Sequence, residues 1–190
     1  MRPHRLIAVF ALLFGMASCN RRDKSPAQQY GIGRPATDSA VAAMNFDIGS
    51  EGAELPAGHG TAAEGAALYA TQCAQCHGKN GEGMGPGLPA LVGRDPKAEQ
   101  FQFANDPKLV HTIGNYWPYA TTLFDYIKRA MPLNAPGSLA DNDIYALTAY
   151  LLAANAVIPD TTALDAASLQ KVRMPYRDRF VPDDRKPNAR

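Results

Sequence analysis

The chain has 190 residues, enough for one domain with extensions. Charged residues make up 19% and the formal net charge at pH 7 is +1, so the chain has no general attraction to nucleic acid or to anionic membranes. With 16 glycines and 15 prolines we expect much irregular backbone, and three cysteines are too few for a disulfide-stapled scaffold.

Residues 1–19 have the layout of an export signal: a short basic start, an apolar run over 6–14 and small residues before Cys19. The run is shorter than the roughly 20 apolar residues that span a bilayer. The segment Met16–Cys19 resembles a bacterial lipoprotein box, which predicts a periplasmic protein that touches the membrane through a lipid on Cys19. Ordinary cleavage after Ala17 and a retained anchor stay open as alternatives.

Residues 20–57 contain charged, glycine-rich and proline-rich stretches without a sustained apolar period, so a linker is predicted. A short docking segment around Met44-Asn45-Phe46 is the alternative. Residues 58–155 carry the helical patterns and the other two cysteines, and we expect the folded domain there.

The first predicted helix starts at Thr61, which with Glu64 has the spacing of a capping box, and leads into Cys73-Ala74-Gln75-Cys76-His77. This C-x-x-C-H motif is typical of covalent c-type haem attachment. Two thiols one helical turn apart can each bond one vinyl group of a porphyrin, and the following imidazole then lies beneath the ring as an iron ligand. The sequence therefore predicts one haem c, attached through Cys73 and Cys76 and ligated by His77.

Other interpretations of the cysteine pair have less support. A thioredoxin-like C-x-x-C follows a strand, whereas this pair follows a predicted helix. A zinc site needs four ligands, and the further histidines His59 and His111 are irregularly spaced. A plain disulfide stays open for an exported protein, although export also agrees with haem, because c-type haem is attached outside the cytoplasm.

Residues 78–96 are dense in glycine and proline and form a long predicted loop. A domain of about 100 residues with so much loop buries too little apolar surface unaided, so we expect the haem to complete its core. Beyond the loop, Asn105-Asp106-Pro107 places a capping side chain before a proline, and apolar residues recur at helical spacing from Leu109 to Ile113. A second helix is predicted there.

A third helix is predicted after Pro118, with Leu123 and Ile127 on one face and an end at Pro132. Met131 directly precedes that proline. Its thioether is the predicted sixth iron ligand, because it follows the third helix in a loop that leads to the last helix. His/Met ligation would fill both axial sites and raise the reduction potential.

Three alternatives for the sixth position stay open: Met174 in the tail, His111, and no protein ligand at all. Met84 lies only a few residues past His77 in a glycine-rich turn, so it is not expected to reach the opposite face of the ring.

A fourth helix is predicted to start within 138–141, with Ile144, Leu147 and Leu151 at helical spacing. Residues 156–190 follow as an extended tail that mixes prolines, acids and arginines and has no apolar period. We expect a partner protein to order this tail, with a plain spacer as the alternative.

Four segments together resemble a class I cytochrome c over about 58–155: residues 65–69, 73–78, 131–132 and 144–151. The resemblance implies that the first and last helices cross at Gly65, Tyr69 and Tyr150, and that a carbonyl within Pro86–Pro89 orients His77. The predicted fold is all-α, a single domain of about four short helices wrapped around a covalent haem, with extended N- and C-terminal segments.

The segments 113–127, 129–132 and 171–175 resemble more narrowly the cytochrome subunits of molybdenum-cofactor sulfite or sulfane dehydrogenases of bacterial sulfur oxidation. This resemblance implies that the chain accepts electrons from a molybdenum subunit and passes them to a downstream acceptor. From the residues themselves, Trp117 and Tyr119 are candidate haem-pocket contacts, because an indole N–H or a phenol O–H can reach a haem propionate.

The remaining function classes differ at the iron. We favour a non-catalytic electron carrier with six-coordinate haem and no substrate site, serving a sulfite or sulfane dehydrogenase. A generic periplasmic shuttle to an oxidase or reductase is the alternative. A haem enzyme acting on a small sulfur compound would need an open or labile axial position. Such enzymes can use a cysteine as iron ligand, but Cys19, the one cysteine outside the haem motif, lies at the processing site.

Overall fold

The computed structural model describes residues 30–93, 101, 103, 105–106 and 108–183. The export signal predicted for 1–19, with Cys19, lies outside them. The chain divides into two units, residues 1–42 and 43–190, which are taken separately. Helix α2 (Asp38–Met44), at the boundary, buries none of its residues. Within the described ranges, no helix combines the length and the apolar character that crossing a membrane requires.

Helix α3 (Ala62–Gln72) begins at the predicted capping box. The Thr61 hydroxyl accepts from the Glu64 N–H at 3.3 Å, and the Glu64 carboxylate accepts from the Thr61 N–H at 2.8 Å. Two of the donors that a helix start leaves unpaired are thereby satisfied. The helix ends where the Cys73 N–H donates to the carbonyl of Tyr69, so the first helix is confirmed.

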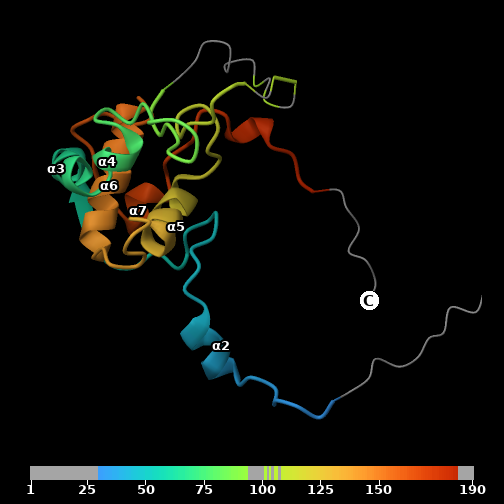
Figure 1. The fold of residues 1–190 in the computed structure, drawn as a ribbon. Coiled ribbons are helices and arrows are strands. Elements are labelled where there is room, and N and C mark those ends of the chain that lie inside the picture. The colour runs from blue at the N-terminus through green and yellow to red at the C-terminus, as the bar shows by residue number, and fades with distance from the viewer. Residues whose placement is uncertain (1–29, 94–100, 102, 104, 107, 184–190) are drawn as a thin grey trace, which may run out of the picture. The chain divides into compact units, whose positions relative to one another are not determined.

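Helix α6 (Asp141–Ala154), the predicted fourth helix, packs along α3 (Figure 1). A Cβ at Gly65 would lie 2.0 Å from the carbonyl oxygen of Ala146, so the two backbones touch where only glycine fits. The rings of Tyr69 and Tyr150 pack beside this contact with centroids 5.0 Å apart. The predicted helix crossing is confirmed.

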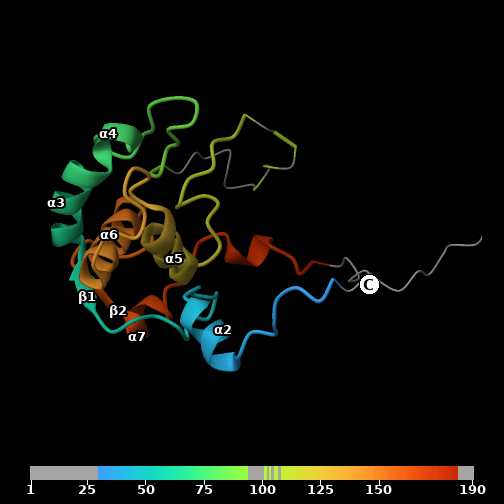
Figure 2. The same cartoon turned by 60° about the horizontal axis from the view of Figure 1, so that its bottom comes forward.

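Helix α5 (Ala120–Ala130) is the predicted third helix and ends at Met131 as expected. It buries Leu123, Phe124 and Ile127, and the Phe124 ring packs against Tyr145 of α6 with centroids 4.5 Å apart. The core therefore lies between α3, α5 and α6. In Figures 1 and 2, α6 lies between α3 and α5.

The prediction of a second helix is wrong, because none of the described residues between 105 and 113 is helical. Their backbone N–H groups bond elsewhere, that of Thr112 to the side chain of Asn115 at 2.7 Å and that of Ile113 to the carbonyl of Leu91 at 3.1 Å. A local side-chain bond and a bond to another loop thus replace the helical ladder that the apolar spacing suggested.

The expected all-α class needs correction, because β1 (His59–Thr61) pairs antiparallel with β2 (Ala163–Asp165), and Gly60 lies opposite Leu164. The second strand belongs to the predicted tail, which continues into α7 (Ala166–Leu169) and the 3-10 helix η4 (Arg177–Arg179). Three of its apolar side chains are buried in the core, those of Leu164, Leu169 and Met174. The segment from Leu164 to Met174 is therefore packed onto the domain, although its few apolar residues are too irregularly spaced to produce a period.

The end of the predicted linker also belongs to the domain. Ile48 is 4% exposed, and its N–H donates to the carboxylate of Asp125 at 2.9 Å. The Tyr145 hydroxyl donates to the carbonyl of Pro56 at 2.8 Å. The docking residue is thus Ile48, whereas Met44 and Phe46 of the suggested docking segment are exposed.

Leu169→Ala should test the packing of the C-terminal segment. Because Leu169 is fully buried, we expect the free energy of unfolding to fall by about 2–5 kcal/mol. The matched control is Val181→Ala, which truncates an exposed side chain in the same segment and should change stability by less than about 0.5 kcal/mol. Equal effects in denaturant titrations of the two variants would contradict the packing.

Candidate functional site

The two cysteines of the motif lie where α3 gives way to a second short helix, α4 (Ala74–His77). The N–H groups of Cys76 and His77 both donate to the carbonyl of Cys73, at 3.1 and 3.0 Å. This turn sets the two thiols one helical turn apart on one surface, and both cysteines are half-buried and not joined in a disulfide. Attachment of the haem through these two thiols stays a prediction.

Burial and the neighbouring Cys76 raise the pKa of the Cys73 thiol to about 11. A free Cys73 thiol is therefore protonated at neutral pH, and its reaction as a thiolate needs a base or a local opening.

A hydrogen bond at Nδ1 fixes the orientation of the His77 ring. Its Nδ1 lies 2.8 Å from the carbonyl oxygen of Pro89, so Nδ1 carries the proton and donates it to that carbonyl. The other ring nitrogen, Nε2, is left as the metal-binding atom. The carbonyl contact expected within Pro86–Pro89 is confirmed, and it comes from Pro89.

The loop that carries Pro89 is folded tightly on itself. The N–H of Gly83 donates to the carbonyl of His77 at 2.8 Å, and the N–H groups of Leu91 and Val92 converge on the carbonyl of Gly81. Gly81 and Gly83 have φ values of 78° and 79°, a region that favours glycine. The glycine-rich sequence is therefore what allows the loop to turn back and bring a carbonyl to the histidine.

Met131 lies at the end of α5 and is half-buried against the hydrophobic core. Its N–H donates to the carbonyl of Ile127 at 3.2 Å, which holds the backbone at the helix end. The competing methionines have other surroundings: Met84 is 60% exposed, and Met174, in the C-terminal segment, is 2% exposed within the core. The assignment of Met131 as sixth ligand stays a prediction.

Trp117 and Tyr119 precede α5, and both are half-buried. The indole N–H of Trp117 donates to the Thr122 hydroxyl at 3.0 Å, and that hydroxyl donates to the carbonyl of Tyr119 at 3.0 Å. The guanidinium carbon of Arg177 lies 4.3 Å from the centroid of the Tyr119 ring, above its face. Their contact with a haem stays a prediction. Arg177 is a neighbour that the sequence analysis missed, because the tail has no periodic pattern.

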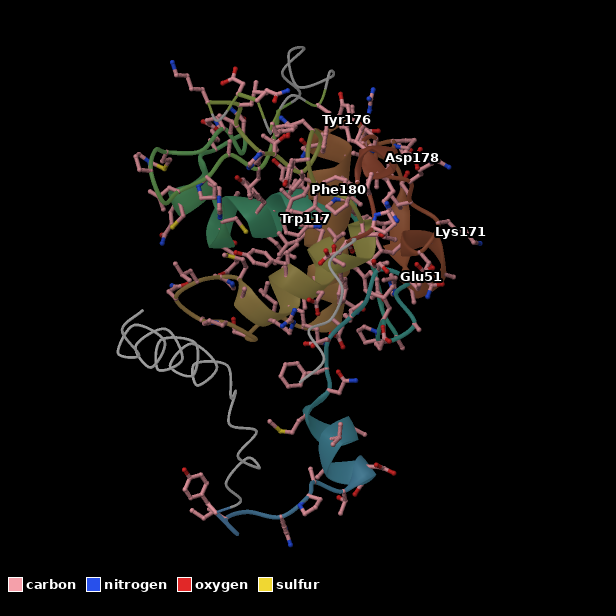
Figure 3. All side chains as sticks on the ribbon, turned by 90° about the vertical axis from the view of Figure 1, so that its right-hand side faces the viewer. Glu51, Trp117, Lys171, Tyr176, Asp178 and Phe180 are labelled. Atoms are coloured by element: carbon pink, nitrogen blue, oxygen red, sulfur yellow. The ribbon has the colours of Figure 1, made fainter. Side chains whose placement is uncertain are left out.

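An open cleft of about 590 Å³ lies beside Tyr119. One wall is formed by residues 118–121 and by Ser50 and Glu51, and the other by residues from 169 to 180. Figure 3 shows Lys171, Asp178 and Glu51 along this side of the domain.

Three comparisons with known proteins each found a match. The family model described as Cytochrome c matches residues 62–155. A chain of the sulfane dehydrogenase SoxCD from Paracoccus pantotrophus is 37% identical with a TM-score of 0.68, and the match covers 82% of this chain and 73% of that chain. The thiosulfate dehydrogenase of Stutzerimonas stutzeri (strain A1501) is 31% identical over 125 residues, covering 64% of this chain. The match covers 36% of that relative, so this chain spans about a third of its length.

Proteins of this family carry covalently bound haem c, and the residues present fit that group. Cys73 and Cys76 offer two thiols one turn apart, and His77 offers an imidazole whose Nδ1 bonds the Pro89 carbonyl, which leaves Nε2 for the iron. Met131 supplies a thioether of the kind that binds haem iron.

Met131→Ala should abolish the weak far-red sulfur–iron band of the oxidised protein. It should also lower the reduction potential by about 0.1 V or more, within the roughly 0.8 V range that axial ligands cover. Visible spectra and a redox titration measure both effects. Met84→Ala, which removes an exposed thioether, is the control and should leave both unchanged. If the band persists in Met131→Ala and disappears in Met174→Ala, the ligand is Met174.

Proposed function

The chain belongs to the cytochrome c family, and we propose that it carries single electrons on one haem c and catalyses no reaction of its own. The observation that carries this proposal is the His77 ring, fixed by the Pro89 carbonyl beside two thiols one helical turn apart. When bound, the haem supplies an iron that alternates between Fe(II) and Fe(III). Cys73 and Cys76 would hold it, and His77 and Met131 would ligate its iron, so that no iron position would be left for a substrate.

The electron donor in this proposal is a molybdenum-cofactor dehydrogenase that oxidises sulfite or sulfane sulfur, and a second protein accepts the electrons downstream. Support comes from the likeness to a chain of a sulfane dehydrogenase and from the segments 113–127, 129–132 and 171–175. The likeness to a thiosulfate dehydrogenase favours, as a second candidate, a haem enzyme acting on a small sulfur compound. That candidate requires a displaceable axial ligand, so a six-coordinate haem that does not bind added thiosulfate or sulfite would exclude it.

The docking surface in this proposal is the C-terminal strap, residues 171–180. Four of its ten residues are basic and one is acidic, so a positive potential faces solvent there. Tyr116 and Phe180, with ring centroids 5.5 Å apart, tie the strap to the segment that precedes α5. Because Arg177 lies over Tyr119, two residues from Trp117, the strap reaches the predicted wall of the haem pocket. An acidic surface on the dehydrogenase fits this arrangement.

Lys171→Glu combined with Arg179→Glu should weaken binding to the dehydrogenase, because both exposed cations would repel an acidic surface. We expect the dissociation constant to rise about tenfold at low salt, equivalent to about 1.4 kcal/mol, with a smaller effect at high salt. The dehydrogenase is first recovered with the tagged holo-protein from the native host and identified by its molybdenum. Binding is then measured by calorimetry and haem reduction by stopped flow.

Arg34→Glu, an exposed change outside the strap, is the matched control and should leave binding unchanged. The reduction potential should stay constant in all three proteins. Recovery of a terminal oxidase without any molybdenum subunit would favour the generic shuttle. A dehydrogenase that binds the double variant as tightly as the parent would place docking on another surface.

We also propose that the protein is periplasmic and tethered by a lipid on Cys19, as residues 1–19 suggest. Cys19→Ser should then abolish incorporation of labelled palmitate and block maturation of the precursor, because a lipoprotein signal is cut only after lipidation of its cysteine. A mature, unlabelled parent protein in the soluble periplasmic fraction would instead indicate ordinary cleavage.

A further inference from the structure

Asn155 follows the last residue of α6, is 2% exposed and lies far along the chain from the haem motif. Its side-chain oxygen accepts from the N–H of Gly93 at 3.2 Å and from the N–H of Gly114 at 3.1 Å. Its side-chain nitrogen donates to the carbonyl of Leu91 at 3.1 Å and to that of Leu151 at 2.8 Å. A primary amide has two donors and two acceptor positions, so this buried side chain uses its full capacity.

Ending a helix does not account for these bonds. The backbone of Asn155 has φ −92° and ψ 9°, outside the left-handed region in which asparagine commonly ends helices. One of the four bonds, to Leu151, returns to α6, and the other three leave the helix for two separate loops. Burying an amide is costly unless every polar atom is bonded, so this side chain orders both loops around it.

The first of these loops carries the carbonyl that holds the proximal histidine. Leu91 is the second residue after Pro89, and Gly93 the fourth. On the side of the haem motif the loop is held by the N–H of Leu91, which donates to the carbonyl of Gly81 at 2.8 Å. Asn155 holds the same stretch from the side of α6. The Pro89 carbonyl is therefore braced between the motif and the end of the last helix.

The second loop is fitted closely to Asn155. A Cβ at Gly114 would lie 2.6 Å from the Asn155 side-chain oxygen, so a glycine lets the backbone approach the amide. The next residue back, Ile113, donates its N–H to the carbonyl of Leu91 at 3.1 Å. Asn155 thus joins the two loops to each other as well as to α6.

We propose that Asn155 is a positioning residue for the axial ligand: it places the Pro89 carbonyl where that carbonyl accepts the Nδ1 proton of His77. This inference rests on the proposed haem ligation. A hydrogen bond at Nδ1 makes the imidazole a stronger donor to the metal, which favours Fe(III) and lowers the reduction potential. A loop released from Asn155 weakens that bond, so the potential rises.

Asn155→Ala in the purified holo-protein tests the proposal without any partner. We expect an upward shift of the reduction potential in a redox titration. We also expect the Nδ1 proton of His77, followed by NMR of the reduced protein, to exchange with solvent at least about tenfold faster, as local opening becomes easier. Asn155→Ser, a milder change whose hydroxyl is too short to reach both loops, should shift both measurements in the same direction and covers the case in which the alanine variant does not fold.

Leu152→Ala is the matched control, because it removes a fully buried side chain from the same helix and leaves the Asn155 bonds in place. It should lower thermal stability and leave the potential and the Nδ1 exchange rate unchanged. Asn155 variants that lose stability and keep the parent potential and exchange rate would show a structural role alone and overturn the proposal. A protein without a c-type haem spectrum would instead refute the proposed function, and the two failures are therefore distinguishable.

Discussion

Helices α3 and α6 touch backbone to backbone, and the position of every other part of the domain depends on that contact. Gly65 of α3 and Gly60 of β1 both face Ala146. An added Cβ would lie 2.0 Å from the Ala146 carbonyl oxygen at Gly65, and 2.3 Å from the Ala146 nitrogen at Gly60. A contact between backbones leaves little freedom, because neither helix can rotate or slide without a steric clash. The contact thereby fixes the position of Cys73, at the end of α3, relative to Asn155, at the end of α6.

Residues that follow the ends of α3 and α6 together form the histidine site. The motif helix α4 continues directly from α3 and carries His77, while the loop that presents the Pro89 carbonyl is bonded to Asn155 beyond α6. A ligand that is held by its own backbone and by a braced acceptor keeps one ring orientation. For an electron carrier this matters because a rigid ligand set keeps the rearrangement between oxidation states small.

The segments on either side of the family-matched region complete the same core. Ile48 reaches α5 from the N-terminal side through Asp125, and Gln170 of the C-terminal side donates to the carbonyl of Gly52 at 2.8 Å. The two flanks therefore contact each other as well as the helices. Ile48 of the N-terminal flank and Leu164, Leu169 and Met174 of the C-terminal flank are buried in the core, so the basic strap is presented on a folded support.

The sequence by itself determined the features that depend on near neighbours in the chain. The capping box at Thr61, the turn that spaces Cys73 and Cys76, and the ends of α5 and α6 follow from local hydrogen bonds and helical period. The helix crossing was predicted through the resemblance to class I cytochromes c, which places Gly65, Tyr69 and Tyr150 at the crossing.

Tertiary structure decided the rest. The segment from 105 to 113 had a helical pattern, yet the N–H of Thr112 bonds the side chain of Asn115 and the N–H of Ile113 bonds the carbonyl of Leu91 in another loop. The strand β2 and the burial of Leu169 and Met174 left no period, because each apolar residue fills a separate gap made by other elements. The four bonds of Asn155 join residues as far as 64 positions apart, and local sequence carries no record of such contacts.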